Sequence, residues 1–439
     1  MPAAQPSGFA ATLLSSPQAG EEVWWQQVAG LGTPLVEAQD SGRVWVTFLW
    51  RDPDGDERYS AIRRVYADIN GVTDHHSTDP QSLERLPGTD VWHWSMAIEH
   101  DWRGSYSLIP IVAAQLPPVF SDDEQQRDEQ QLEWWCSLFP CAIADPLNRD
   151  QSWGEQLSAA HMPAAPSQQA WRAVDNGTAL PPDAARLTVL DWKSEQLDNQ
   201  RRIWLYTTGI SDEPAQRPLC IVLDGQKWAE ETPLFAALEA ETAAGHLPPA
   251  VWLFIDAIDG ETRCRELPCD TAFWLAVQDE LLPQAARLAP FSDDPYRTVV
   301  SGQSYGGLAA LYAGLRWPQR FGRVLTQSGS FWWPNLQFIT DFDQRDMLEP
   351  GVLVTEVRQG GRTASPLVIF QEAGRREADI AFVNQQMHEA LVAAGHQVRQ
   401  RVYAGGHDTL CWRGGLIDGF RWLLTGDNPR AASGLGCAR

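Results

Sequence analysis

A pentad of the form Gly-x-Ser-x-Gly contains a serine that could act as a nucleophile. It reads GQSYG over residues 302–306, after the apolar residues 298–300 and before a segment, 308–315, with helical periodicity. A strand, a sharp turn and a helix expose such a serine above a sheet, and the two glycines leave room for the turn. We therefore predict that Ser304 is a catalytic serine; the alternative is a helix N-cap at an ordinary turn.

A serine hydroxyl needs a histidine to accept its proton and a carboxylate to orient that histidine. In α/β-hydrolases the acid and then the histidine follow the serine along the chain, and three histidines do so here. His388 falls inside a predicted helix and His396 at the end of that helix. His407 instead follows a strand predicted over 398–402, on a Gly-Gly turn. We predict that His407 is the general base.

The acid is expected just after the strand predicted over 367–371. Glu372, Glu377 and Asp379 are the candidates. Glu372 falls at the end of the strand, and Asp379 falls in the first turn of the next helix, where acids are common because of the helix dipole. Glu377 is the best placed of the three, and the choice among them stays open.

The oxyanion that forms during attack on an ester needs two backbone N–H donors. One is expected from Tyr305, the residue after the nucleophile, and the other from the loop after the strand predicted over 219–223. That loop reads DGQKW over 224–228. Gly225 allows a turn that points a peptide N–H inward, so we predict Gly225 or Gln226 as the second donor.

Two different patterns of elements surround these residues. Residues 43–50, 61–69, 91–98 and 104–112 are short segments, rich in β-branched and aromatic residues and separated by turn signals, which is typical of an all-β sandwich. From residue 186 onward, apolar strands alternate with helices, which predicts a doubly wound, mostly parallel sheet. The predicted fold class is α/β, with an α/β-hydrolase domain preceded by an all-β sandwich domain.

The predicted domains follow from these patterns. They are a disordered leader (1–20), the sandwich (21–156), a Pro- and Ala-rich linker (157–185), the catalytic domain (186–427) and a C-terminal tail (428–439). The catalytic domain is predicted to contain strands at 202–206, 219–223, 251–255, 297–300, 324–327, 367–371 and 398–402, and helices at 233–244, 271–288, 308–315, 379–394 and 416–424. The acid- and Gln-rich run 121–133 is expected to be a solvated insertion or a short surface helix.

The composition is that of a globular protein. The chain has 439 residues, 44% of them hydrophobic, and a formal net charge of −23 that disfavours nucleic acid as a partner. No apolar run approaches the roughly 20 residues that cross a bilayer, and the first twenty residues lack the features of an export signal. Seven scattered cysteines fit reduced thiols in a cytoplasm, and no zinc-like spacing indicates a metal site.

The C-terminal half resembles the enterochelin (enterobactin) esterase family. Matching stretches include LDGQKWA at 223–229, RTVVSGQSYGG at 297–307, QSGSFWW at 327–333 and GGHDTLCWRGG at 405–415. The N-terminal half, with FLWR at 48–51 and DWRGSY at 101–106, resembles that family's β-sandwich domain. The resemblance places the triad on Ser304, Glu377 and His407. It implies cytoplasmic hydrolysis of the serine trilactone of ferric enterobactin or a glucosylated relative, without a cofactor and with iron only as part of the substrate.

A ferric tris-catecholate is anionic and carries flat aromatic rings, so its site should offer guanidinium groups and stacking faces. The expected substrate contacts are Arg263, Arg413, Trp412, Trp332 and Lys227. For Arg263 the alternative is a surface ion pair with Glu261 or Glu266. A packing role is the alternative for Trp332, and a solvated side chain is the alternative for Lys227.

Two other functions fit the same residues. A carboxylesterase for feruloyl or acylated-sugar substrates would keep the whole triad. A catalytically silent siderophore-binding protein would keep only the ligand contacts. The intact Gly-rich pentad with Ser304 and His407 favours an enzyme over a binding protein.

Overall fold

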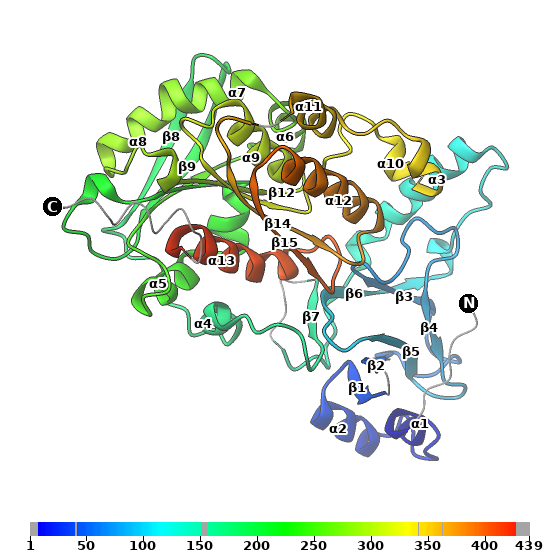
Figure 1. The fold of residues 1–439 in the computed structure, drawn as a ribbon. Helices are drawn as coiled ribbons and strands as arrows, with labels where there is room; N and C mark the ends of the chain where they lie inside the picture. The colour runs from blue at the N-terminus through cyan, green and yellow to red at the C-terminus, as the bar shows by residue number, and fades with distance from the viewer. Residues whose placement is uncertain (1–7, 40–41, 151–155, 341, 362, 427–439) are drawn as a thin grey trace. The chain divides into compact units, whose positions relative to one another are not determined.

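The computed structural model of this chain describes residues 8–39, 42–150, 156–340, 342–361 and 363–426. They divide into two compact units, which are described separately. The sandwich unit comprises the chain up to Ser167 together with Ala404–Cys411, and the hydrolase unit comprises Gln168–Tyr403 and the chain from Trp412 onward. Figure 1 labels the elements of both units. The predicted tail, 428–439, lies outside the described residues.

The sandwich unit contains a seven-stranded antiparallel sheet with the order β1-β2-β5-β4-β3-β6-β7. The strands are β1 (Leu35–Ala38), β2 (Arg43–Arg51), β3 (Ile62–Ile69), β4 (Ser82–Arg85), β5 (Val91–Glu99), β6 (Arg103–Val112) and β7 (Ser158–His161). The four strands predicted in this region correspond to β2, β3, β5 and β6. The sequence patterns missed the short strands β1, β4 and β7.

The sheet folds back on itself through β4, which pairs with both β3 and β5. Phe48 on β2 and Tyr106 on β6 come from strands that are not neighbours in the sheet, yet their ring centroids lie 5.0 Å apart. Alternate residues of both layers, such as Val46 and Leu108, are buried in the core between them. The structure therefore confirms the predicted sandwich.

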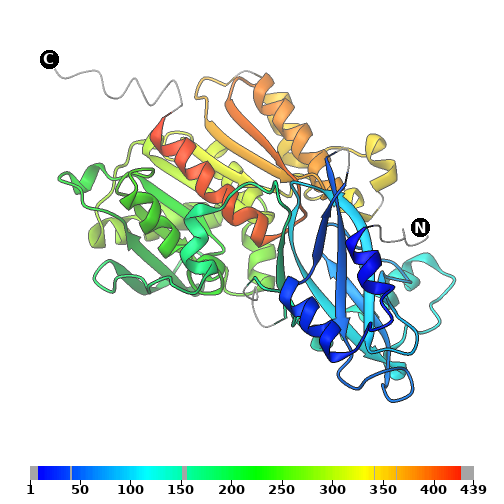
Figure 2. The same cartoon turned by 90° about the horizontal axis from the view of Figure 1, so that it is seen from below.

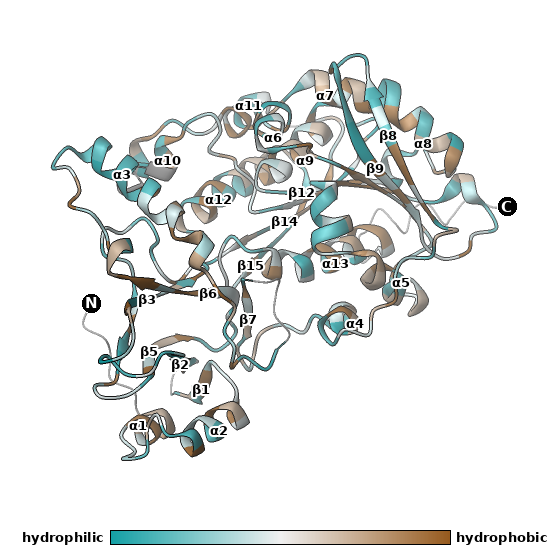
Figure 3. Cartoon of the chain, turned by 180° about the vertical axis from the view of Figure 1, so that it is seen from behind, coloured by the Kyte–Doolittle hydropathy of each residue, from teal (hydrophilic) through white to brown (hydrophobic). Residues whose placement is uncertain are grey.

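Three helices cover the outer faces of the sandwich. Helices α1 (Phe9–Leu14) and α2 (Glu22–Leu31) bury apolar side chains against Leu49 and Val91. The prediction of a disordered leader over 1–20 is therefore wrong from Phe9 onward. Helix α3 (Glu124–Ser137) corresponds to the acid- and Gln-rich run, and its ribbon is largely hydrophilic in Figure 3.

The predicted linker begins too early. Residues 158–161 form β7, which pairs with β6, although Ser-Ala-Ala-His carries little β-forming signal. Residues 168–175, which include α4 (Arg172–Asp175), belong to the hydrolase unit. There Trp171 is fully buried and its Nε1 donates to the carbonyl of Arg413 at 3.0 Å.

The hydrolase unit is built on an eight-stranded sheet with the order β15-β14-β13-β12-β10-β11-β9-β8. The strands are β8 (Leu187–Ser194), β9 (Asn199–Thr207), β10 (Leu219–Leu223), β11 (Val251–Ile255), β12 (Thr298–Gln303), β13 (Arg323–Gln327), β14 (Val368–Gly374) and β15 (Gln397–Tyr403). The six strands from β10 to β15 are parallel, and β9 is antiparallel to both of its neighbours, β11 and β8. This confirms the predicted mostly parallel sheet, and adds the edge strand β8.

Helices cover both faces of this sheet. They are α5 (Phe235–Ala243), α6 (Gly260–Glu266), α7 (Thr271–Ala276), α8 (Leu282–Leu288), α9 (Tyr305–Arg316), α10 (Gln337–Thr340), α11 (Val352–Gly360), α12 (Ala378–Ala393) and α13 (Thr409–Thr425). One apolar core contains residues of α7, α8, α9, α11 and α12, and the other contains residues of α5 and α13. Figure 2 views the second face, with α13 in red.

Strand β10 shows why the sheet needs both layers. Leu219, Ile221 and Leu223 contribute to one core, whereas Cys220 and Val222 contribute to the other, because successive side chains point to opposite faces. None of the helices in the described part of the chain has the length and apolar character that a bilayer crossing requires.

The strand order changes direction between β10 and β12. The chain runs from β10 to β11 on one side, and then returns to β12 on the other side of β10. Ligands of open α/β sheets bind at such a switch point, beyond the carboxyl ends of the strands. The loop that begins at Asp224 and the turn at Ser304 both start there.

Candidate active site

Ser304 occupies the turn between β12 and α9 with φ 57° and ψ −121°. This is a strained conformation for a residue other than glycine. It is tolerated because the surrounding residues are small: a Cβ on Gly302 would collide with the carbonyl of Gly306. Ser304 stands at the N-cap position of α9, but its side chain makes no capping hydrogen bond to that helix. Its Oγ lies 3.3 Å from Ser330 Oγ.

Glu377 immediately precedes α12 and is buried, with 5% of its surface exposed. Its Oε1 accepts hydrogen bonds from Ser328 Oγ at 2.8 Å and from Tyr403 Oη at 2.6 Å. Ser328 Oγ in turn accepts from Trp412 Nε1 at 2.9 Å. The two hydroxyl donors fix the orientation of the Glu377 carboxylate.

The sequence patterns did not single out Ser328 or Tyr403. Ser328 directly follows β13, Tyr403 ends β15, and Glu377 follows β14, which lies between those two strands. The signal that could have found them is therefore their position at the carboxyl ends of two predicted strands. Ser328 also has a positive φ of 47°, which the sequence does not reveal.

The other two acid candidates have different environments. Glu372 is fully buried in β14, where Arg401 Nη2 forms an ion pair with its Oε2 at 2.6 Å and Gln327 Nε2 donates to its Oε1. Burial raises the pKa of Glu372, and Arg401 acts in the opposite direction. Asp379 lies in the first turn of α12. The choice of Glu377 as the triad acid stays a prediction.

His407 lies in the segment Ala404–Cys411, which belongs to the sandwich unit. Its backbone carbonyl accepts from Asn70 Nδ2 at 3.1 Å, and the carboxylate of Asp408 accepts from the N–H of Ser105 at 2.5 Å. A Cβ on Gly406 would collide with the side chain of Asn70. The segment is thus held closely within its unit, and the approach of the His407 imidazole to Ser304 and Glu377 stays a prediction.

The predicted oxyanion donors lie at the ends of β10 and β12. Tyr305 is the first residue of α9, and the N–H groups of a first helical turn have no partner within the helix. A Cβ on Gly225 would come within 2.6 Å of the backbone nitrogen of Ile255, so the loop approaches β11 too closely for any side chain. Gln226 Oε1 accepts from the N–H of Ala257 at 3.0 Å, which anchors the same loop.

Arg263 does not pair with Glu261 or Glu266, the partners weighed from the sequence. Its Nε donates to Asp224 Oδ1 at 2.6 Å, and its Nη2 donates to Asp224 Oδ2 at 2.9 Å. Glu266 instead pairs with Arg201 at 2.5 Å. A bidentate arginine–carboxylate pair is geometrically specific, so the Arg263 guanidinium has a defined position beside the nucleophile turn.

Arg413 has a structural role rather than the expected substrate contact. Its side chain is 1% exposed, and its guanidinium donates to both carboxylate oxygens of Asp175 at 2.5 and 3.0 Å and to Gln168 Oε1 at 2.6 Å. It also lies 5.2 Å from the ring centroid of Trp171. Arg413 therefore ties residues 168–175 to α13.

The remaining three expected contacts lie near the same edge of the sheet. Trp412 is buried and donates to Ser328, and Lys227 Nζ lies 6.0 Å from the Trp412 ring centroid. The ring of Trp332 is buried and lies 5.6 Å from that of Tyr305, a packing contact. Substrate contact by Lys227, Trp412 and Trp332 stays a prediction.

Comparisons with known proteins agree with this architecture. Residues 45–171 match the family model "Enterochelin esterase, N-terminal", and residues 194–423 match "Putative esterase". The chain is 96% identical over 433 residues to the iron(III) enterobactin esterase of Dickeya dadantii (strain 3937), covering 99% of this chain and 100% of that protein.

Solved structures give the same result. The ferric enterobactin esterase of Salmonella typhimurium is 46% identical with a TM-score of 0.81, and the match covers 92% of this chain and 99% of the other. The enterobactin esterase of Shigella flexneri, solved in the presence of enterobactin, is 44% identical with a TM-score of 0.76 over 93% and 99% of the two chains. This chain therefore belongs to the enterochelin esterase family.

Proposed function

We propose that this chain hydrolyses the ester bonds in the serine trilactone of iron(III) enterobactin or a close catecholate relative. The iron is cargo of the substrate, and its release follows from breakage of the macrocycle. The proposal is supported by relatives named as iron(III) or ferric enterobactin esterases that match nearly the whole chain. The six cysteines among the described residues are free thiols, which supports a reducing, cytoplasmic location.

The proposed chemistry is acyl transfer in two steps. His407 accepts the proton of Ser304, and the alkoxide attacks a lactone carbonyl. The oxyanion accepts hydrogen bonds from the N–H of Tyr305 and from that of Gly225 or Gln226. His407 then returns the proton to the departing serine alcohol, and water repeats the sequence on the acyl-enzyme. Three rounds would divide the trilactone into its acyl-serine units.

The acid has a defined part in this scheme. Glu377 Oε1 is occupied by the hydroxyls of Ser328 and Tyr403. We assign Glu377 Oε2 to the imidazole N–H of His407, where a carboxylate fixes the tautomer and stabilises the imidazolium that forms.

One observation carries the proposal: Ser304 has the strained turn of a nucleophile elbow, at the switch point of a parallel sheet. Ser304→Ala should lower kcat for iron(III) enterobactin by at least about 10⁴-fold, because the nucleophile is lost. Quenching of protein fluorescence should show retained siderophore binding. The matched control is Ser330→Ala, which removes the neighbouring hydroxyl but not the nucleophile. Turnover by Ser304→Ala within tenfold of the parent would contradict the assignment.

A second measurement separates the alternative functions. A fluorophosphonate probe should form one covalent adduct, which peptide mass spectrometry should map to Ser304. Absence of the adduct would indicate a silent binding protein. Comparing kcat/KM for iron(III) enterobactin, a feruloyl ester and a simple aryl ester identifies the substrate class. A feruloyl ester as the preferred substrate would overturn the siderophore assignment.

A further inference from the structure

One arginine contacts both of the loops that contain the proposed oxyanion donors. Arg263, on α6, binds both carboxylate oxygens of Asp224. The same Nη2 donates to the backbone carbonyl of Gln303 at 3.3 Å. Asp224 directly precedes Gly225, and Gln303 directly precedes Ser304. A single guanidinium therefore links the end of β10 to the end of β12.

The geometry around Asp224 requires such support. Its φ is 54°, in the left-handed region that favours glycine, and its side chain is only 7% exposed. Its Oδ2 lies 3.2 Å from the position of a Cβ on Gly306, beside the first turn of α9. A carboxylate is favoured near a helix N-terminus. Tyr305, the other proposed donor, is the first residue of that helix.

The charge of Arg263 is balanced by this pairing. Nε and Nη2 of the guanidinium bind the two carboxylate oxygens of Asp224, and Cζ lies 5.8 Å from the ring centroid of Tyr305. Without Arg263, the buried carboxylate of Asp224 would be uncompensated and close to the oxyanion that forms during attack. Loss of the arginine would thus misplace one loop and add an unfavourable charge at the reaction centre.

We infer that Arg263 and Asp224 are positioning residues, which set the distance between the two oxyanion donors, rather than contacts to the siderophore. This inference rests on the proposed function. Experiment can distinguish it from the alternative, because a positioning residue affects the hydrolysis of every ester that Ser304 attacks. A guanidinium that binds a catecholate acts only on substrates that carry one.

The test uses the full chain and two substrates: iron(III) enterobactin, and p-nitrophenyl acetate, which is small and uncharged. Arg263→Met should lower kcat about 10- to 100-fold on both substrates, somewhat less than removal of a whole oxyanion donor. KM should stay within about threefold. Arg263→Lys should recover part of the loss, because lysine keeps the charge but not the bidentate geometry.

The pair itself is tested by a double variant. Asp224→Asn combined with Arg263→Met removes the uncompensated charge, so its kcat should exceed that of Arg263→Met alone on both substrates. Additive losses would contradict the electrostatic part of the inference. Circular dichroism and melting temperature confirm that each variant is folded.

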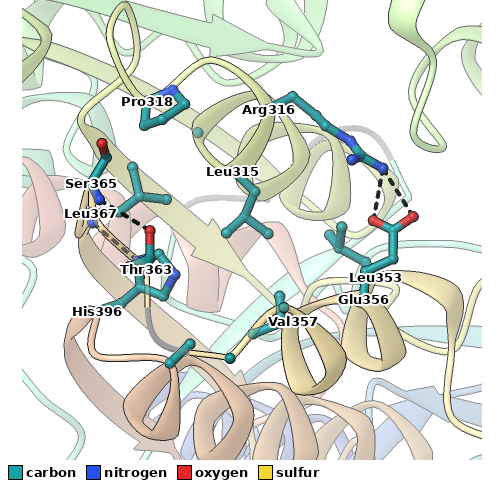
Figure 4. A pocket seen from close by; sticks show the side chains of 14 residues that line it. Leu315, Arg316, Pro318, Leu353, Glu356, Val357, Thr363, Ser365, Leu367 and His396 are labelled. Carbon is teal, nitrogen blue, oxygen red and sulfur yellow. Dashed lines mark hydrogen bonds and ion pairs between the residues drawn. The ribbon is translucent and has the colours of Figure 1, made fainter.

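The chain provides a matched control at the other end of α9. Arg316 Nη2 donates to both carboxylate oxygens of Glu356 at 2.9 and 2.8 Å, as Figure 4 shows, and its Cζ lies 5.2 Å from the Tyr312 ring centroid. Arg316→Met removes the same kind of arginine–carboxylate pair, away from Ser304, and should leave kcat unchanged.

Two outcomes would overturn the inference. A rise in KM for the siderophore alone, with p-nitrophenyl acetate unaffected, would make Arg263 a substrate contact. If Arg263→Met has the same kinetics as the parent on both substrates, Arg263 has no role in catalysis. If the parent chain cleaves p-nitrophenyl acetate but not the siderophore, the proposed substrate fails, and the aryl ester still decides the role of Arg263.

Discussion

At the scale of single residues, hydrogen bonds from neighbouring side chains hold the buried carboxylate of Glu377, the proposed triad acid. Its Oε1 accepts from Ser328 and Tyr403, and Ser328 is held in turn by the indole of Trp412. Tyr403 is on β15, Trp412 is on α13, and Ser328 directly follows β13. The Glu377 carboxylate is thus oriented directly by Ser328 and Tyr403, and indirectly by Trp412.

Removing one of these hydroxyls should slow the reaction without weakening substrate binding. Hydrogen bonds to charged groups contribute about 1.5–3 kcal/mol, so Tyr403→Phe should lower kcat about 10- to 100-fold with KM nearly unchanged. Steady-state kinetics on iron(III) enterobactin checks this. Tyr296→Phe is the control, since its hydroxyl bonds to the carbonyl of Pro366. A kcat of Tyr403→Phe equal to that of the control would remove Tyr403 from the catalytic apparatus.

The residue types in the sequence predicted the chemistry of the protein better than they predicted which side chains pair with one another. The strand, turn and helix around Ser304 were predictable because the pentad and its flanking elements are local in sequence. The partner of Arg263 was not: Asp224 lies 39 positions away, whereas the acids weighed as partners were its close neighbours. Arg413 was mistaken for a substrate contact because nothing in the sequence distinguishes a buried arginine from an exposed one.

At the scale of elements, the parallel strands were predictable because they are buried on both faces and are therefore continuous apolar runs. Strands β10 and β11 begin and end where the sequence predicted. The edge strand β8 was missed, since most of its side chains are at least partly exposed and several are polar. Strands β4 and β7 have only four residues each, too few to show alternation.

The loop after β10 gives a prediction about an element rather than a side chain. Gly225→Ala would place a Cβ 2.6 Å from the backbone of β11, which cannot yield as a flexible side chain can. The loop should therefore shift and carry its N–H away from the oxyanion. We expect kcat to fall at least about tenfold and the free energy of unfolding to fall by about 1–3 kcal/mol.

Kinetics and urea denaturation measure both effects of Gly225→Ala. The control is Gly260→Ala, at the first position of α6, where a Cβ would meet no atom within 4 Å. It should keep the parent stability and activity. A Gly225→Ala variant that behaves like Gly260→Ala would show that this loop does not need its close approach to β11.

At the scale of the whole molecule, the sequence predicted two folding units and the order in which they occur. It did not predict that a late segment, Ala404–Cys411, belongs to the first unit. That segment is held by hydrogen bonds to residues about 300 positions earlier: the N–H of Arg103 donates to Ala404, and Cys411 Sγ donates to the carbonyl of Arg103. Contacts between such distant positions leave no periodic pattern in either segment.

The stability of the molecule should depend on pH through a histidine away from the proposed chemistry. His396 lines a cavity of about 220 Å³ with Leu315, Leu353 and Leu367 (Figure 4). Its Nδ1 accepts from the N–H of Leu367 at 3.0 Å. Burial lowers the pKa of His396 to about 4, from an ordinary value of 6.5. The folded chain therefore holds this imidazole neutral, and protonation would break its hydrogen bond.

The sign of the effect follows from which state binds more protons. Between pH 6.5 and about 4 the unfolded chain protonates His396 and the folded chain does not, so stability falls as the pH falls through this window. We expect His396 to account for about 1 kcal/mol of that loss, a value reduced for its partial exposure to solvent.

His396→Gln keeps an acceptor for the N–H of Leu367 and does not titrate. The stability of this variant should therefore decline less than that of the parent, when urea denaturation is repeated from pH 7.5 to 4.5. The parent chain, measured over the same pH range, is the reference. If His396→Gln declines in parallel with the parent, the acid sensitivity of the hydrolase unit arises from other groups.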